Sequence, residues 1–322
     1  MPVVAGRPGL PGLPVPAVAG RPGLPGLPVP VVAGRPGLSV PIVIVQGVKD
    51  PAVSEGLVFL EGRPGRRLRP YVTHLSAYTE RYTRPLPRRQ PPFAGAVMIF
   101  GFAEPLALDG PGAEAPQRLV SFAGGLHDTY VDTAMTGLAE GVQVDLTPLG
   151  ARRLLGMPMS ELANRVVSLA EALGPWAESA VERLAGAPDR QARLALLDEL
   201  LTRRIHAAPE PDRRIRWAWG RLVATRGTIA VASLAEELGW SHRHLVSRFH
   251  DQIGLAPKAV AKVLRFEHAA ARLRAGLPLA DTAVRCGYYD QAHMNRDFRA
   301  MTGATPREVA APRPGSTAAA PG

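Results

Sequence analysis

The stretch AVRCGYYDQAHMNRDFRAMTGATPREV, residues 283–309, repeats a pattern that AEELGWSHRHLVSRFHDQIGLAPKAV, residues 235–260, shows earlier in the chain. Each copy has an alanine, then a glycine and a large aromatic residue, two large apolar residues four apart, a second glycine and a proline. The offset between the copies is 48 residues at the alanine and becomes 49 after one extra residue in the second turn. The duplication predicts two copies of one structural unit.

The residue types in the pattern predict helices and their ends. The first glycine, Gly239 or Gly287, is expected to end a helix, because glycine adopts the left-handed conformation at least cost. The second glycine ends the next helix, and the proline after it suits the first turn of another. The paired apolar residues between them, spaced (i, i+4), bury one face of that helix. These pairs are Leu245 with Phe249 and Met294 with Phe298. Each copy is thus a helix-turn-helix unit.

Residues 213–309 resemble the DNA-binding domain of the AraC/XylS family of transcriptional regulators. The family's stronger signature is its second motif, which AVRCGYY (283–289) and FRAMTGATP (298–306) match. Tyr288 stands where phenylalanine is commoner and Met294 where a bulkier apolar residue is frequent, and both positions keep a large apolar side chain. The resemblance implies an all-α domain with two helix-turn-helix units joined by a helix, bound to double-stranded DNA.

The helix faces opposite the buried pairs carry the candidate DNA contacts. They follow an i, i+1, i+4, i+5 pattern, so each set forms one compact patch on its helix. The patches are His242, Arg243, Val246 and Ser247 in the first unit, and Gln291, Ala292, Asn295 and Arg296 in the second. Arginine can bond guanine, Asn and Gln can bond adenine, and small apolar groups can meet a thymine methyl.

Carried over from the family, these helices would lie in the major groove. The residues implied to contact bases are Arg243, Val246, Ser247, Gln291, Ala292, Asn295 and Arg296. Because Val246 and Ser247 are short, we expect the first unit to contribute more to affinity than to discrimination. Residues 257–274 predict one connecting helix with a length of roughly 27 Å. Such a spacer could place the two candidate DNA-contacting helices in successive major grooves, about 34 Å apart.

Positive charge is concentrated in this region. Residues 212–309 hold 16 Lys and Arg against nine Asp and Glu, or seven of the chain's ten net positive charges. The candidates for phosphate contact, which position a protein without specifying sequence, are His242, Lys258, Arg299 and Arg307. An ordinary solvated charge is the alternative for each of them.

The whole composition fits an intracellular protein, and its net positive charge fits nucleic acid, an anionic surface or good solubility as alternatives. The 322 residues are 46% hydrophobic, enough for two domains, and the sequence pI is near 10.5. A single cysteine allows no internal disulfide and fits a reducing compartment. Without a run of about 18 apolar residues or a signal-peptide pattern at the N-terminus, we expect a cytoplasmic protein that does not contact a membrane.

The first 50 residues differ from the rest. VAGRPGL recurs with a period of 14 residues, in a segment rich in proline and glycine. Interruptions break the glycine register that a collagen helix requires. We expect residues 1–50 to be a disordered leader, or an upstream repeat translated from a wrongly chosen start. A disordered tail is expected over residues 311–322.

Between the leader and the DNA-binding region, residues 54–206 predict an α+β domain. GLVFL, AVMIFGF, RLVSFAG and GVQVDL predict strands, and the pattern turns helical from Pro148 to about Arg204. Residues 207–214, with two prolines, predict a linker. By the resemblance, this region is a cupin-like sensor or dimerisation domain, and GVQVDLTPLGARRLLG (141–156) is similar to the N-terminal region of one group of such regulators.

Catalytic and metal-binding patterns are weak. His127, Asp128 and Asp132 form the best cluster, but His127 lacks the histidine two residues away that a cupin metal site needs, so a hydrogen-bonded loop is favoured. Cys286, at the end of a predicted helix, fits a small packing residue better than a redox-sensing thiol. No Walker A, G-x-S-x-G or paired Cys-x-x-C motif occurs. We therefore predict no catalysis, no cofactor and no metal.

The sequence predicts a sequence-specific, DNA-binding transcriptional regulator. Its N-terminal domain would bind a ligand, dimerise, or both, and so shift the population that is competent to bind DNA. Beyond DNA, the candidate partners are a small-molecule effector, a second copy of the chain and RNA polymerase. The alternatives are an enzyme whose N-terminal domain is tethered to DNA, and an architectural protein that binds DNA without reading its sequence.

Overall fold

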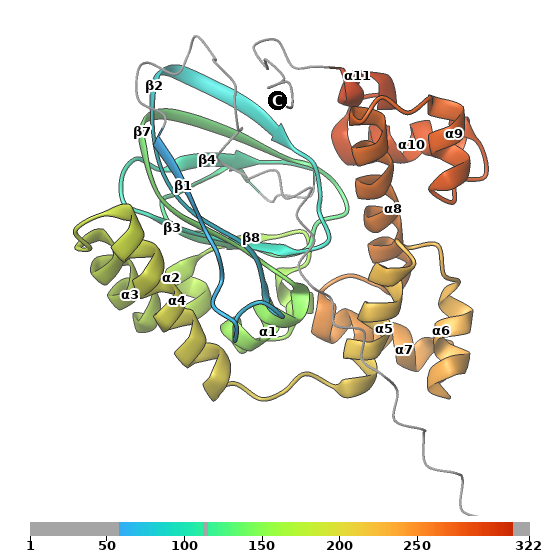
Figure 1. The fold of residues 1–322 in the computed structure, drawn as a ribbon, viewed down its shortest axis with the longest axis horizontal. Coiled ribbons are helices and arrows are strands. Elements are labelled where there is room, and N and C mark those ends of the chain that lie inside the picture. The colour runs from blue at the N-terminus through green and yellow to red at the C-terminus, as the bar shows by residue number, and fades with distance from the viewer. Residues whose placement is uncertain (1–57, 112–114, 312–322) are drawn as a thin grey trace, which may run out of the picture.

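The computed structural model describes residues 58–111 and 115–311 of the chain. The leader expected over residues 1–50, and the expected tail apart from Ala311, lie outside the described residues. Within the described part, an antiparallel sheet with flanking helices comes first and a helical region follows it (Figure 1). The predicted fold class, an α+β region followed by an all-α region, is confirmed.

Eight strands form one sheet, in which every pairing is antiparallel. The strand order is β1-β2-β7-β3-β6-β8, and β4 pairs with β5 and with the first part of β7. The strands are β1 (Val58–Gly62), β2 (Val72–Gln90), β3 (Ala96–Gly101), β4 (Leu106–Asp109), β5 (Gln117–Leu119), β6 (Phe122–Gly124), β7 (Val131–Leu146) and β8 (Val166–Ser168).

The long strands β2 and β7 form the centre of the sheet and pair along most of their length. The sequence analysis did not predict β2, because its second half is rich in arginine and contains Pro85 and Pro87. Pro85 lies inside a register shift between Tyr82 and Leu86, and Pro87 follows it and pairs with Ala134 of β7, in a part of β2 that does not pair with β1. A strand with one partner there tolerates residues that lack a backbone N–H.

Helices cover one face of the sheet and bury the larger of its two cores. They are α1 (Pro148–Leu155), α2 (Leu169–Leu173), α3 (Pro175–Ala185) and α4 (Arg190–Ala207), with a short 3-10 helix, η1 (Met159–Leu162), between α1 and β8. The prediction of a helical pattern from Pro148 to about Arg204, which includes MSELANRVVSLAEALG (159–174), is wrong over residues 163–168. Asn164 has a φ of 55°, which interrupts a helix, and Val166 and Val167 pair with β6.

The helical region begins at Arg213 and is organised around one long helix. Its helices are α5 (Arg213–Ala224), α6 (Val231–Leu238), α7 (His242–Ile253), α8 (Pro257–Arg274), α9 (Leu279–Arg285), α10 (Gln291–Thr302) and α11 (Pro306–Ala310). The prediction that residues 257–274 form one helix is confirmed. Its residues enter two hydrophobic cores, one shared with α5–α7 and the other with α9–α11. None of the described helices is both long enough and apolar enough to cross a membrane.

The sheet region packs directly against the helical region. Leu126 and Leu149, which belong to the sheet region by sequence, are buried in the core that α5–α7 form. Arg152 of α1 lies 3.5 Å from the Asp251 carboxylate and donates to the Asp251 carbonyl at 3.1 Å. The expected linker lies between α4 and α5, and the Asp212 backbone N–H in it donates to the Gln252 side chain at 3.1 Å. Contacts of several kinds therefore join the two regions.

Candidate nucleic-acid interface

The first helix-turn-helix unit consists of α6 and α7. Helix α6 ends at Gly239, whose φ of 63° places it in the left-handed region where glycine is favoured. Ser241 caps α7, because its hydroxyl accepts from the His244 backbone N–H at 3.2 Å. The Leu245 and Phe249 side chains are completely buried, as the sequence predicted. These contacts fix the direction of α7 relative to the rest of the unit.

The second unit, α9 and α10, repeats this design. Gly287, after the end of α9, has a φ of 75°. Asp290 caps α10 by accepting from the His293 backbone N–H at 2.6 Å. Met294 and Phe298 are completely buried, and the Phe298 ring meets Phe266 of α8 edge to face at a centroid distance of 4.8 Å. Both predicted buried pairs are therefore confirmed.

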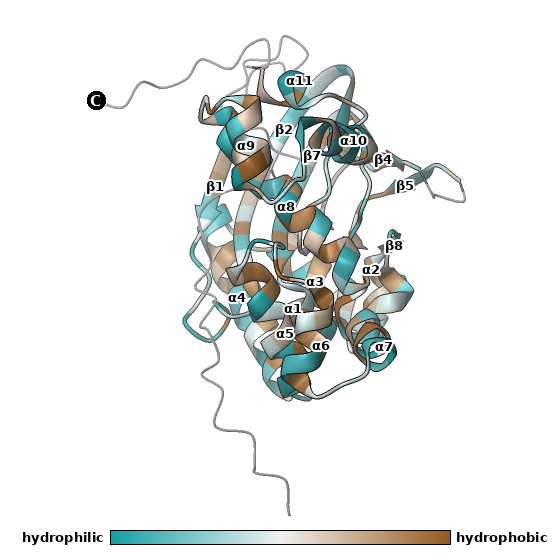
Figure 2. Cartoon of the chain, turned by 90° about the vertical axis from the view of Figure 1, so that its right-hand side faces the viewer, coloured by the Kyte–Doolittle hydropathy of each residue, from teal (hydrophilic) through white to brown (hydrophobic). Residues whose placement is uncertain are grey.

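The predicted base-contacting residues lie on the outer faces of α7 and α10. Most of them are exposed, and Val246 and Asn295 are half-buried. In Figure 2, α7 and α10 lie towards the same edge of the molecule, with α10 above and α7 below. The two helices that carry the patches therefore lie towards opposite ends of α8. That each of these residues contacts a base stays a prediction.

The positive charges on these faces are available to an anion. Neither Arg243 nor Arg296 forms an ion pair with another described residue. The four predicted phosphate contacts, His242, Lys258, Arg299 and Arg307, are all exposed. Of these, Arg299 lies close enough to Glu308 to contribute to its depressed pKa, which is lowered mainly by the hydrogen bond from the Thr305 backbone. Their role on DNA stays a prediction.

An ion pair that the sequence analysis missed holds α10 against α8. The Asp297 carboxylate is almost completely buried, and Lys262 of α8 lies 3.3 Å from it. His293, one turn before Asp297 on α10, lies 3.9 Å from the same carboxylate. Because Lys262 and Asp297 are 35 positions apart, local spacing could not predict this ion pair. The sequence feature that could have indicated it is an aspartate on the apolar face of a predicted helix.

The extra residue in the second turn is also outside the predicted set. Tyr288 aligns with Trp240 of the first unit and is buried, so the additional position is Tyr289. The Tyr289 side chain is 92% exposed and directly precedes Asp290, the residue that caps α10. A large aromatic side chain is thus placed beside the N-terminus of α10.

The candidate catalytic residues do not assemble into a site. Asp132 pairs with Arg89 through two bonds of 2.8 Å, and the Asp128 backbone N–H donates to Asn164 at 2.9 Å. Within residues 58–111 and 115–311, no three His, Cys, Asp or Glu side chains are grouped to hold a metal ion. Cys286 is buried, its sulfur lies 3.5 Å from the His268 ring, and burial raises the pKa of its thiol.

Two family models match the chain. Residues 234–311 match a helix-turn-helix domain, and residues 60–168 match a domain of unknown function, DUF6597. The chain is 29% identical over 107 residues to the uncharacterized HTH-type transcriptional regulator YbfI of Bacillus subtilis strain 168, covering 31% of this chain and 39% of YbfI. It is also 29% identical over 90 residues to an uncharacterized HTH-type transcriptional regulator of Staphylococcus aureus, covering 28% of this chain and 12% of that protein. The chain thus spans well under half of the length of these relatives.

Solved structures give similar, partial matches. A probable AraC family transcriptional regulator from Rhodopseudomonas palustris CGA009 is 28% identical, with a TM-score of 0.29, over 31% of this chain and 95% of that one. ToxT from Vibrio cholerae O395 is 11% identical, with a TM-score of 0.41, over 72% of this chain and 94% of that one.

The C-terminal region of the chain is a helix-turn-helix DNA-binding domain. It is a domain of the AraC type, with two units joined by α8, so the resemblance to AraC/XylS regulators is confirmed for this region.

Proposed function

We propose that the chain is a sequence-specific transcriptional regulator whose α7 and α10 read two sub-sites on one face of DNA. The observation that carries this proposal is the placement of α7 and α10, whose candidate contact residues are mostly exposed, towards the two ends of one continuous helix. Helix α8 has 18 residues, which at 1.5 Å each make roughly 27 Å. One chain could then reach successive major grooves on an asymmetric site.

The sheet region, in this proposal, controls DNA binding by taking up a ligand or by pairing with a second copy. A ligand shifts the active population only if it binds one arrangement of the two regions better than another. The direct packing of Leu126 and Leu149 into the first unit's core supports such control, since a change in the sheet region reaches α5–α7 through these side chains. RNA polymerase is the further partner that an activator would require.

We also propose that the chain is not an enzyme. The best acid-base candidates are used in structural contacts: Asp132 is paired with Arg89, and His127 is bonded to the Gly125 carbonyl at 2.9 Å. Incubation with a mixed panel of divalent metals, followed by metal analysis of the full chain, checks this part. Stoichiometric metal retained at His127 would contradict it.

Selection of bound sites from random double-stranded DNA with the full chain tests the main proposal. In about 150 mM salt we expect an enriched motif with two sub-sites about ten base pairs apart. Strong, salt-sensitive binding without an enriched motif would favour an architectural protein instead. A motif with one sub-site would mean that one helix only, α7 or α10, reads sequence.

A further inference from the structure

The two helix-turn-helix units touch each other beside α8, in addition to being joined by it. The residues that connect α5 to α6, in the first unit, lie against the turn after α9, in the second. A Cβ at Gly287 would lie 2.8 Å from Thr228 Cγ2 and 3.7 Å from Arg265 Cδ. The backbone of the second turn is therefore in van der Waals contact with the first unit. A contact of this kind limits how far the units can move relative to each other.

Arg226, one of these connecting residues, has a backbone conformation that its residue type disfavours. Its φ is 53°, in the left-handed region that glycine or asparagine usually occupies at the end of a helix. Its guanidinium reaches α8, where Nη1 lies 2.7 Å from Nε2 of His268. Because an unfavourable backbone conformation is kept at a residue whose side chain has a partner on another helix, that side chain is the candidate for a functional role.

His268 joins the first unit to the second through one ring. Nε of Arg272 donates to the same ring nitrogen at 2.9 Å. A guanidinium only donates hydrogen bonds, so Nε2 accepts from both arginines and the ring proton is on Nδ1. Nδ1 lies 3.5 Å from the sulfur of Cys286, at the end of α9. The ring therefore bonds to Arg226 of the first unit on one side and meets Cys286 of the second unit on the other.

Arg265, one turn earlier on α8, spans the two units in the same way. Its Nη1 donates to the Gly227 carbonyl at 3.2 Å, and its guanidinium lies 5.9 Å from the centre of the Tyr288 ring. Gly227 belongs to the first unit and the buried Tyr288 to the second. Residues 265, 268 and 272 are three and four positions apart, so they lie on one face of α8. The two units meet along this face.

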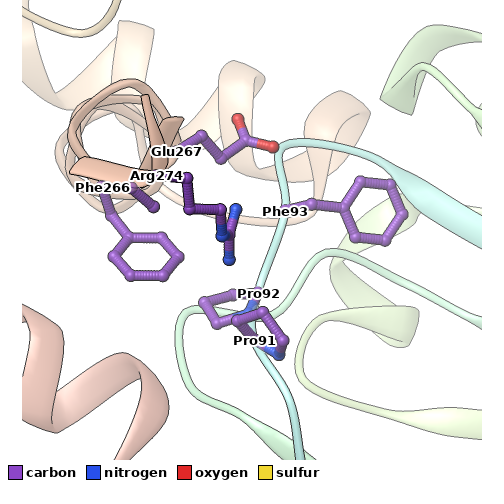
Figure 3. Close-up of a pocket in the computed structure, with 7 residues that line it drawn as sticks. Pro91, Pro92, Phe93, Phe266, Glu267 and Arg274 are labelled. Atoms are coloured by element: carbon purple, nitrogen blue, oxygen red, sulfur yellow. The ribbon is translucent and has the colours of Figure 1, made fainter. Parts of the chain in front are cut away.

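The sheet region supports α8 on the opposite face. Glu267 and Arg274 line a small hollow together with Pro91 and Pro92 of the segment after β2 (Figure 3). The Ala94 backbone N–H donates to the Glu267 carboxylate, and Ala94 packs against the cores of both units. Helix α8 is thus held on two sides in its second half, which limits bending between the units.

We propose that the inter-unit contact, made by Arg226, Arg265 and His268, fixes the distance and the angle between α7 and α10. The chain then binds two sub-sites at one spacing. One extra base pair moves the second sub-site by about 3.4 Å and rotates it by about 35° around the DNA axis. Units that are held together cannot follow this change, so these residues select the spacing without touching DNA. The inference rests on the proposed reading of two sub-sites and names the residues that set their spacing.

Binding of the full chain to the selected motif, with one base pair inserted or deleted between the sub-sites, tests this proposal. We expect the wild type to lose at least about tenfold in affinity on either change, since the two units can no longer engage together. Arg226→Asn removes the guanidinium but keeps a residue type that tolerates positive φ, and His268→Leu removes the acceptor. Each should reduce the loss to less than about threefold and change the affinity for the original spacing by less than about threefold.

Conservative variants separate the inter-unit contact from a general effect on folding. Arg226→Lys keeps a donor and His268→Gln keeps an acceptor, so both should retain a loss of at least about fivefold. Arg226→Asn should unfold at about the same urea concentration as the wild type, because the better fit of asparagine to positive φ offsets the lost hydrogen bond. Arg183→Leu, an exposed change on α3, is the control and should keep the wild-type spacing profile.

A pair of engineered cysteines measures the inter-unit contact without DNA. A Cβ at Gly287 would lie 3.6 Å from the Thr228 Cβ, within the range of a disulfide. Thr228→Cys with Gly287→Cys is made in a Cys286→Ser background, which removes the neighbouring thiol. Equilibration with glutathione gives the effective concentration of the two thiols. Adding Arg226→Asn should lower this concentration at least about fivefold, because the two turns then separate more often.

Equal spacing losses in the wild type, Arg226→Asn and His268→Leu would overturn the role of these residues in spacing. A wild type that binds all three spacings alike would overturn the fixed arrangement of α7 and α10. An unchanged effective concentration of the thiols would overturn the inter-unit contact itself. If selection gives no motif with two sub-sites, the proposed function fails, and the thiol measurement still decides whether the two units are held together.

Discussion

The surroundings of a single residue determine whether its side chain is charged in the folded chain. Asp145, at the end of β7, is almost completely buried on the inner face of the sheet, and it accepts from the Gln143 side chain at 2.8 Å. Burial raises the pKa of its carboxyl to about 7. A carboxylate at such a position is unfavourable unless it is neutralised, so the residue is expected to hold its proton at pH values below about 7.

This gives a prediction about stability and pH. Between the ordinary pKa of an aspartate and the raised value of Asp145, the folded state keeps a proton that the unfolded state has released. The contribution of Asp145 to stability is therefore fully present below the pKa of an ordinary aspartate and is lost as the pH rises through this window. Asp145→Asn removes the titration, so between about pH 5 and pH 8 the variant should lose less stability than the wild type, by on the order of 2 kcal/mol. Urea unfolding at several pH values measures this. The exposed Asp281→Asn should keep the wild-type slope, and an equally steep slope in Asp145→Asn would refute the assignment.

A second prediction at this scale separates base contacts from phosphate contacts on α10. Arg296→Ala should reduce the discrimination between bases at one position of the bound motif by about 1–3 kcal/mol of binding free energy. The other sub-site should be unchanged. Arg299→Ala, on the same helix and also exposed, should weaken binding to all sequences alike. It should also reduce, by about 1, the steepness with which the logarithm of the binding constant falls with the logarithm of the salt concentration. Competition binding with single-base variants at two salt concentrations distinguishes them. Identical specificity profiles for both variants would contradict the assignment of roles.

At the ends of helices, the type of residue determines whether the backbone conformation that ends the helix can form. Gly239 and Gly227 both have positive φ, at 63° and 74°. A Cβ at Gly239 would have no neighbour within 4 Å, whereas one at Gly227 would lie 2.1 Å from the Ala261 carbonyl oxygen. The first glycine is therefore needed for its conformation alone, and the second also because the backbone of α8 passes against it.

The matched pair Gly239→Ala and Gly227→Ala tests this distinction. We expect Gly239→Ala to reduce the free energy of unfolding by about 1 kcal/mol, the effect of left-handed backbone in an L-residue. Gly227→Ala should be clearly more destabilising, because α8 must move to admit the methyl group. Tryptophan fluorescence in urea reports both, since Trp217, Trp219 and Trp240 lie in this region. Equal losses would show that the close approach to Ala261 has no energetic effect.

At the scale of the whole molecule, the two regions share side chains. Helix α1 takes part in both hydrophobic cores, because Leu149 is buried in the first helix-turn-helix unit and Leu155 in the sheet core. The two leucines are similarly exposed, at 5% and 6%. Cores that share a helix are expected to unfold together.

We therefore predict one cooperative thermal transition for the sheet region and the first helix-turn-helix unit. Leu149→Ala and Leu155→Ala should each lower it, with a loss of about 2–4 kcal/mol, although their side chains face different cores. Calorimetry with tryptophan fluorescence as a second probe measures this. Two separate transitions, with Leu149→Ala shifting only one of them, would show that the regions fold independently.

The sequence by itself determined the helix-turn-helix units, because each rests on local rules. Glycines with positive φ, caps and (i, i+4) apolar pairs act within a few residues, and duplication doubled the signal. It did not determine β2 or the interruption of residues 159–174, since pairing with β7 and β6 overrides local propensity there. Only the tertiary structure brought Lys262 to Asp297, and the segment around Ala94 to α8, because these contacts join residues far apart in the chain. Local residue patterns determined the two helix-turn-helix units, and long-range packing determined how those units are held.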